Sequence, residues 1–439
     1  MNAQSPMFPW SRKIPRGQLY FDPAVVLRET VGRLGRRPLE GEVVRRFERA
    51  FASAHEAPFA VALPHARVAL HYLLQILALP AGSEVVMTPL TIPEIVNVVL
   101  IAGLRPVFVD VGQRTCNIDC DDLERRITSR TRLLLLTHLS GLPSEMERVM
   151  AIAHAHRLEV LEDCSQAHGT RHRGRMLGLF GRAGFMSLTP LKPVATFHGG
   201  VTVTTDPAIE RELRRIDAAA PPPFSRKKLL QLFIRDNLLH GVTNVTNFSW
   251  VTYYAVRAAE ALRPELVREF QRGNMLNAPE RRWRVTRFGR LPEWMYARYS
   301  DYQAAIGLRM LSTLAEGNRR RRELSLRLLQ LLREQNVPGL LRIPVDENDC
   351  TFWRFPLWLE NPATPDGLRR HLLALGIDSA ATNLACCSRE EAFAEFNTDT
   401  PEAGRFVDEM IFLPMHPNLK EADMRRIASG ISSYYAGLT

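Results

Sequence analysis

Four short apolar runs, separated by segments with helical periodicity, constrain this chain more strongly than any other feature of its sequence. The runs span residues 83–89, 105–110, 132–138 and 158–161. Runs of this length that are rich in valine and leucine are typical of strands buried on both faces. Strands that alternate with helices predict an α/β fold with a mostly parallel sheet covered by helices on both sides.

The sequence before the first of these runs predicts a helix, a strand and a second helix. Apolar residues recur at helical spacing over Glu42–Ala54, a short strand is expected over Phe59–Leu63, and a helix is expected over 65–78. The turn between that strand and the second helix suits an anion, because free N–H groups and the helix dipole point towards it.

A carboxylate and a lysine occupy positions that suit a cofactor site. Asp163 comes just past the end of the run 158–161, and ligands of open α/β sheets bind at the carboxyl ends of strands. A carboxylate there can keep a ring nitrogen protonated, because a nearby opposite charge favours the charged form. Pyridoxal 5'-phosphate needs such a partner and a lysine for its Schiff base, for which Lys192 is the candidate. Either residue alone would be interpreted as a helix N-cap or as a solvated surface charge.

The residues around these two positions resemble a known family. The chain reads Glu-Asp-Cys-Ser-Gln-Ala-His-Gly over 162–169, places Ser187 five residues before Lys192, and continues with Gly199-Gly200. This pattern resembles that of the DegT/DnrJ/EryC1/StrS family of pyridoxal-phosphate-dependent sugar aminotransferases. The resemblance extends without large gaps from about residue 40 to residue 206.

The resemblance implies a role for each matching position. Asp163 would pair with the pyridine nitrogen, Gln166 would lie at the ring hydroxyl, Ser187 would bind phosphate and Lys192 would form the Schiff base. It also implies the fold of pyridoxal-phosphate-dependent transferases of fold type I, with a large, mostly parallel sheet domain and a smaller C-terminal α/β domain. A homodimer is expected on the same ground.

Composition and resemblance together predict four parts of the chain. They are an N-terminal arm (1–30), a large cofactor-binding domain (31–212), a helical, basic and aromatic connector (213–295) and a small C-terminal domain (296–439). The last part opens with a motif over 296–308 that is similar to the family's N-Y-R-x-S-D-x-Q-A-A-x-G-x, in which Arg298 and Gln303 agree.

Several cofactor-holding positions depart from the family pattern. His65-Ala66-Arg67 stands where relatives have S-G-T, Ile92 replaces an aromatic residue that stacks on the pyridine ring, and Tyr296 replaces an asparagine that touches the cofactor phosphate. Arg67 either supplies charge to the phosphate or points away from it and covers the helix. Residues 381–387 replace a segment that helps relatives to hold their sugar substrate, so the sequence does not identify the acceptor substrate.

Charge and cysteine usage limit the partners of the chain. A net charge of +10 fits an anionic partner, namely a phosphorylated substrate, an anionic membrane surface or nucleic acid. No nucleic-acid-binding motif accompanies the dispersed arginines, so nucleic acid is not expected. The six cysteines lack the spacing of a disulfide framework or zinc site and are expected to be free thiols, and no metal is expected. The N-terminus lacks the apolar region of a signal peptide, and a cytoplasmic protein is expected.

The connector segment 224–263 allows two interpretations. A basic stretch over Arg226–Arg235 precedes an uncharged stretch over Asn237–Val256 that contains Phe248, Trp250, Tyr253 and Tyr254. This composition suits a peripheral contact with the inner membrane surface. It equally suits a helical insertion that packs on a partner subunit or covers the active site. A run of arginines at 319–322 is expected to form a solvated helix face.

The function expected from the sequence is a pyridoxal-phosphate-dependent aminotransferase. An amino acid, glutamate by resemblance, would give its amino group to the keto group of a nucleotide-linked sugar or of an unusual or lipid-linked acceptor. One alternative is a dehydratase-type reaction on the same scaffold, although such relatives replace the lysine with histidine and this chain keeps Lys192. Another is a non-catalytic regulatory subunit, because the changes at 65–67, 92 and 296 all affect positions that hold the cofactor.

Overall fold

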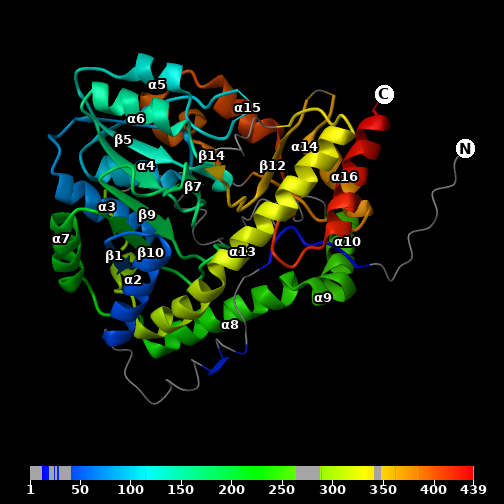
Figure 1. Cartoon of the computed structure of the whole chain (residues 1–439), viewed down its shortest axis with the longest axis horizontal. Coiled ribbons are helices and arrows are strands. Elements are labelled where there is room, and N and C mark those ends of the chain that lie inside the picture. Colours follow the sequence, from blue (N-terminus) through cyan, green and yellow to red (C-terminus); the bar gives the residue numbers. More distant parts are fainter. Residues whose placement is uncertain are drawn as a thin grey trace, which may run out of the picture.

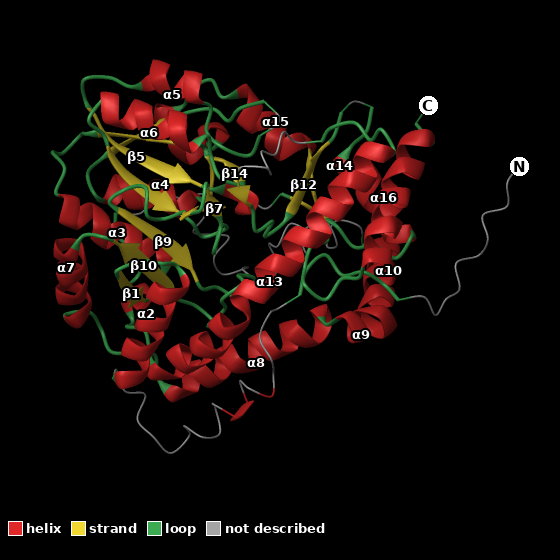
Figure 2. Cartoon of the chain, in the orientation of Figure 1, coloured by secondary structure: helices red, strands yellow, loops and turns green. Residues whose placement is uncertain are grey.

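A seven-stranded sheet forms the framework of the N-terminal half (Figures 1 and 2). Its strand order is β1 (Phe59–Leu63), β10 (Gly200–Thr204), β9 (Ala183–Ser187), β6 (Glu159–Asp163), β5 (Thr131–Thr137), β2 (Glu84–Met87) and β4 (Arg105–Phe108). The five strands from β9 to β4 are parallel, whereas β10 runs antiparallel to both β9 and β1. The predicted α/β fold with a mostly parallel sheet is confirmed.

The computed structural model describes residues 12–18, 24, 27–28, 41–113, 115–263, 287, 289–340, 348–360, 362–382 and 384–438. Most of the predicted arm (1–30) and residues 264–286 of the predicted connector lie outside the described residues. Within the described part, no helix combines the length and the apolar character needed to cross a bilayer.

Helices cover both faces of the sheet because alternate residues of each central strand are apolar on both sides. In β5, Leu134 and Leu136 belong to one buried cluster, and Leu133 and Leu135 belong to another. The covering helices are α2 (Glu42–Ala54), α3 (Ala66–Leu77), α4 (Pro93–Ile101), α5 (Cys120–Arg126), α6 (Met146–Ala155) and α7 (Pro207–Ala218). The predicted helix 42–54, strand 59–63 and helix 65–78 are confirmed to within one residue.

The C-terminal part has its own buried core around a small antiparallel sheet. That sheet consists of β12 (Phe355–Trp358), β15 (Met410–Leu413) and β13 (Ala380–Ala381), with helices α14 (Pro365–Ala374), α15 (Pro401–Glu409) and α16 (Glu421–Ala436). Short elements complete the described chain: β3 (Leu90–Thr91), β7 (Arg171–His172), β8 (Arg175–Met176), β11 (Asn348–Asp349), β14 (Ala385–Cys386), η1 (Leu139–Gly141), η3 (Glu293–Tyr296), η4 (Cys387–Arg389) and η5 (Glu391–Phe396).

The long helix α13 (Asp301–Glu334) connects the two cores (Figure 1). It begins with a capping box in which Ser300 accepts from the backbone of Gln303 and the Gln303 side chain accepts from the backbone of Ser300. Met310 packs in the core of the large sheet, and Leu328 packs in the C-terminal core. The helix therefore contributes to both of the predicted domains, and the division at residue 296 stays a prediction.

The expectation of a fully solvated arginine face on α13 was wrong for one residue. Arg321 is 1% exposed. Its guanidinium donates to the carbonyl of Thr351 (3.2 Å) and to Oδ1 of Asn318. These acceptors compensate for the burial of the charge and tie α13 to the segment that leads into β12.

Residues 226–262 of the proposed connector form α8 (Arg226–Thr243), α9 (Val245–Asn247), a π-helical turn η2 (Phe248–Thr252) and α10 (Tyr253–Leu262). In Figure 1 this segment runs below α13, from the large sheet towards α16. The six cysteines are free and buried, in agreement with their expected state as free thiols.

Candidate active site

Asp163 lies at the carboxyl end of a central strand. The prediction placed it just past the strand, whereas β6 extends through it because its backbone pairs with Thr137 and Phe185 of the two neighbouring strands. Oδ1 accepts from the backbone N–H of Ser165 (2.9 Å). Burial of the carboxyl raises its pKa, and the positive charge of Lys192 acts in the opposite direction. Asp163 is therefore a buried acid for which a cationic partner would be favourable.

Lys192 lies in the loop between β9 and β10, against Trp353 of the C-terminal part. Its Nζ is 3.8 Å from the ring centroid of Trp353, and the guanidinium carbon of Arg354 is 4.4 Å from the same centroid. Trp353 is held in place because its Nε1 donates to the carbonyl of Leu191 (2.8 Å). Burial and the nearby charge of Arg354 lower the pKa of Lys192 to about 7, against a smaller opposite effect of Asp163. The structure therefore brings the amine into the field of the predicted carboxylate.

A measurable pH dependence follows from this pKa. A lysine with a pKa of about 7 is half neutral at that pH, whereas one at its usual 10.5 is almost entirely charged. Since only the neutral amine is nucleophilic, the rate at which the apoprotein captures pyridoxal phosphate should rise between pH 6 and 8, followed by visible absorbance. In Arg354→Gln the midpoint should move to higher pH because a repelling charge is removed. A midpoint near 10 in the parent would contradict this prediction.

Gln166 and Ser187 lie on either side of these residues in the chain. Gln166, half-buried after β6, accepts from the backbone N–H of Ser140 at its Oε1 (2.9 Å). This leaves the amide NH₂ as the donor group of that side chain. Ser187 ends β9, and its hydroxyl lies 3.1 Å from Oγ1 of Thr189. Both side chains are positioned by local contacts.

The turn between β1 and α3 forms a backbone cradle. Gly200 starts β10 so close to this turn that a Cβ at this position would lie 2.5 Å from the backbone nitrogen of Ala66. The N-cap residue His65 makes no side-chain hydrogen bond to the first turn of α3. Its Nε2 is buried without a partner among the described residues. A helix N-terminus with a buried, unpaired ring nitrogen suits a bound anion.

Gly200→Ala should disrupt this cradle. Because the new Cβ meets backbone atoms, β10 and the start of α3 must separate, and we expect a loss of about 2–3 kcal/mol in the free energy of unfolding together with weaker binding of pyridoxal phosphate. Gly289→Ala is the matched control, since a Cβ there meets nothing within 4 Å. Denaturant unfolding and fluorescence titration measure the two effects. Equal free energies of unfolding of Gly200→Ala and Gly289→Ala would show that the close approach of Gly200 to Ala66 does not constrain the cradle.

Arg67 does not point freely into this cradle. Its Nη1 lies 3.2 Å from Oε1 of the buried Glu94 on α4. Of the two interpretations left open by the sequence, this contact favours the one in which Arg67 covers the helix, because the carboxylate already offsets its charge.

Ile92 lies beside the segment that replaces the family's substrate-binding motif. It caps α4 directly after β3, and β14 pairs antiparallel with β3, with Ala385 opposite Thr91. The backbone N–H of Cys387 donates to the carbonyl of Pro89 (2.9 Å). Residues 385–387 are therefore folded onto the edge beside Ile92, where an aromatic residue was expected.

Tyr296 and Arg298 contact the outside of the cradle within one chain. The ring of Tyr296 stacks on Tyr72 of α3 with centroids 6.1 Å apart. Burial raises the pKa of Tyr296. The backbone N–H of Arg298 donates to the carbonyl of Pro221 (3.1 Å).

The fold brings three residues into the site to which the sequence assigned no role there. Trp353 and Arg354 lie in the predicted C-terminal domain, and nothing local linked them to a lysine about 160 positions earlier. The third is His198, whose ring centroid lies 5.1 Å from that of His65 and whose carbonyl accepts from the Gln303 side chain (2.9 Å). The conspicuous Thr-Phe-Trp-Arg stretch was the only available signal.

A second titratable cluster supports the strand that carries Asp163. Ligand atoms of His138, Glu162 and Cys164 lie within 4.8 Å of one another. The Glu162 carboxylate, however, accepts from three backbone N–H groups, those of Gly178, Phe180 and Gly181, at 2.7–2.8 Å. With these donors on the carboxylate, the cluster is a hydrogen-bonded support for β6.

The residues present fit pyridoxal phosphate. A buried carboxylate, a nearly neutral lysine and an uncapped helix start with an unpaired buried nitrogen supply the ring partner, the amine and the anion cradle. At the face of the pyridine ring the fit differs from the family pattern, because the aliphatic Ile92 stands where relatives have an aromatic residue.

Comparisons with known proteins identify the family. The profile of the DegT/DnrJ/EryC1/StrS aminotransferase family matches residues 32–228 and 265–432. The spore coat polysaccharide biosynthesis protein SpsC of Bacillus subtilis is 25% identical over 414 residues, which is 91% of each chain. GDP-perosamine synthase of Escherichia coli O157:H7 is 34% identical over 167 residues, but the match covers only 38% of this chain and 46% of that protein.

Solved structures show the same fold. An aminotransferase from Psychrobacter cryohalolentis superposes with a TM-score of 0.73 at 22% identity, covering 96% of this chain and 99% of the other. DesV from S. venezuelae gives a TM-score of 0.69 at 24% identity, covering 97% and 99%.

Proposed function

The chain belongs to the DegT/DnrJ/EryC1/StrS family of pyridoxal-phosphate-dependent aminotransferases, and on this basis we propose that it transfers an amino group from glutamate to the keto group of a nucleotide-linked sugar. The observation that carries the proposal is the lowered pKa of Lys192, about 7, together with a buried carboxylate, Asp163, whose charge acts on this amine. GDP-perosamine synthase is a relative whose name denotes a nucleotide-linked amino sugar.

Each site residue has a definite task in this proposal. Pyridoxal phosphate, when bound, supplies the electron sink for removal of the proton from Cα of the donor. Lys192 would hold the cofactor covalently and, once released, would carry that proton on its Nζ. Asp163 would keep the ring nitrogen protonated, and the NH₂ of Gln166 would donate to the ring hydroxyl. Ser187 and the backbone at Ala66 would hold the phosphate, while Trp353 would exclude water from one side of the amine.

The acceptor pocket supports a substrate that differs from those of typical relatives. Within the segment that replaces the usual substrate-binding motif, Ala385 and Cys386 pair with β3 at the edge near Ile92. An unusual or lipid-linked keto sugar is the variant that this change favours. In a homodimer, Tyr296 and Arg298 would reach the active site of the neighbouring subunit. Light scattering of the pure protein tests whether it is a dimer.

A spectroscopic titration tests the proposed function. The purified protein with pyridoxal phosphate should be yellow, and glutamate should bleach the visible band in a single turnover without acceptor. Glutamine and aspartate serve as competing donors. Colour should return only with a keto acceptor, which identifies its class from a panel of nucleotide-linked and lipid-linked sugars. A protein that stays colourless would be a non-catalytic family member, and bleaching without amino transfer to any acceptor would favour another reaction.

A further inference from the structure

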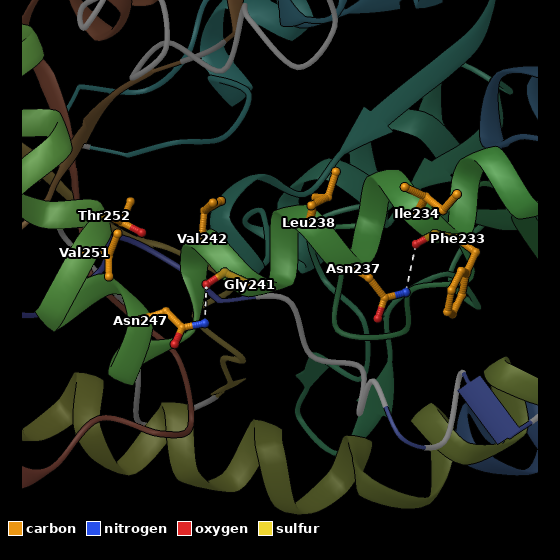
Figure 3. A pocket seen from close by; sticks show the side chains of 9 residues that line it. All are labelled: Phe233, Ile234, Asn237, Leu238, Gly241, Val242, Asn247, Val251 and Thr252. Carbon is orange, nitrogen blue, oxygen red and sulfur yellow. Dashed lines mark hydrogen bonds between the residues drawn. The ribbon is translucent and has the colours of Figure 1, made fainter.

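Helix α8 has two apolar faces. Its inner face packs into the core of the large sheet through Leu229, Leu232 and Leu239. Its outer face carries Leu230, Ile234, Leu238 and Val242, which are spaced four residues apart and are 41–67% exposed. Figure 3 shows Ile234, Leu238 and Val242 pointing to the same side of the helix. A helix that is apolar on two sides has a second surface to bury.

The neighbouring turn extends this apolar surface. Trp250 and Val251 of η2 are 53% and 67% exposed. A cavity of about 510 Å³ lies between α8 and this turn, and residues 233, 238, 242 and 251 are among those that line it. We call Leu230, Ile234, Leu238, Val242, Trp250 and Val251 the docking face. The side-chain amides at the cavity, Asn237 and Asn247, donate to backbone carbonyls of their own segment (2.8 and 3.0 Å), so the face itself is apolar.

The surroundings of the docking face are basic. Lys227 and Lys228 are exposed at the start of α8. Between Ser225 and Ala259 the only acidic residue is Asp236, which is 1% exposed and pairs with Arg235 (2.6 Å). The next acid, Glu260, is bound to Arg369 of α14 (2.9 Å). The exposed charge around the apolar surface is therefore positive.

The docking face is attached rigidly to the rest of the molecule. The Ser249 hydroxyl accepts from the backbone N–H of Lys13 (2.9 Å), and the Tyr253 hydroxyl donates to the carbonyl of Leu373 (3.0 Å). The segment also falls in the gap between the two ranges that match the family profile, which leaves residues 229–264 unmatched. The face is thus an addition to the aminotransferase framework that is firmly built into the fold.

We propose that the docking face binds the surface of an anionic phospholipid bilayer. Leucine, isoleucine and tryptophan side chains enter the boundary between headgroups and acyl chains, and lysines beside them meet anionic headgroups. A second copy is a poorer occupant, because its docking face is flanked by the same exposed lysines, and the only acid between Ser225 and Ala259, Asp236, is buried. The proposal concerns where the protein resides and does not depend on the identity of the acceptor.

Vesicle sedimentation tests the proposal with the full-length protein. We expect binding to vesicles of phosphatidylcholine with phosphatidylglycerol and weak binding to phosphatidylcholine alone. Ile234→Gln with Leu238→Gln should reduce binding to the anionic vesicles at least tenfold without changing net charge. Lys227→Gln with Lys228→Gln should reduce it by about an order of magnitude. Leu438→Gln, at an exposed apolar residue outside the face, is the control and should bind like the parent.

Two further readouts make the outcomes decisive. Vesicles with brominated acyl chains should quench the tryptophan fluorescence of the parent protein. The same vesicles should quench the fluorescence of Trp250→Phe to a smaller extent. If the double glutamine variant bound as well as the parent and all binding disappeared in high salt, attraction would come from net charge alone and the proposal would be wrong. A change of mass in light scattering for that variant would show that a second copy covers the face. Unchanged visible absorbance with pyridoxal phosphate confirms that the variants remain folded.

Discussion

Lys192→Ala is expected to yield a protein that no longer becomes yellow with pyridoxal phosphate and that loses at least about 10³-fold in kcat/KM. The reason is that the only amine placed beside Asp163 by the described structure is removed, and with it both the covalent anchor and the proton carrier. Stability should not fall much, because burial already disfavours the charged form of this lysine. Absorbance spectra and donor half-reactions measure the effect.

Lys192→Arg is the matched variant for this prediction. An arginine keeps a positive charge near Trp353 but stays protonated at all accessible pH values and cannot act as a nucleophile. We therefore expect it to be as colourless as the alanine variant. If Lys192→Arg kept substantial activity, the role of this residue would be electrostatic, and the assignment of the Schiff base to Lys192 would fail.

Asp163→Asn is the second substitution with a large expected effect. An asparagine can still accept the hydrogen bond from Ser165, but it no longer offers a negative charge to the ring nitrogen. An opposite charge at close range shifts a pKa by 1–3 units, so a loss of about 10- to 10³-fold in kcat/KM is expected. The measurement is the donor half-reaction, followed by the visible band.

Stability should move in the opposite direction in this variant. Burial raises the folded pKa of Asp163, so its ionised form destabilises the apoprotein once the pH rises above that pKa. The neutral asparagine removes this cost, and the apoprotein should unfold at the same or a higher denaturant concentration at pH 8. A variant that lost activity together with several kcal/mol of stability would indicate a structural role instead. Ser165→Ala keeps the charge and the backbone donor and removes only the hydroxyl bond to the carboxyl, so it separates loss of a hydrogen bond from loss of the charge.

The order of strands and helices followed from the local sequence. Alternating apolar runs specify strands that must be covered on both faces, and this pattern was sufficient for the parallel part of the sheet. It did not determine that β10 runs antiparallel between β9 and β1, because strand direction depends on how the chain returns after Lys192. The same limitation affected Arg321, whose burial depends on acceptors at Asn318 and Thr351.

The sequence by itself supplied the candidates for the chemistry: Asp163 at a strand end, Lys192 in a loop and the Gly-Gly that opens β10 stand out by residue type, spacing and resemblance to the family. Only the tertiary structure decided their properties. The pKa of Lys192 depends on burial and on Arg354, and Arg67 is neutralised by Glu94, in each case through residues distant in the chain. Likewise, the apolar residues of α8 look alike in sequence, and only packing separates the buried face from the exposed one. Burial and electrostatic fields are properties of the assembled molecule, so no local pattern could supply them.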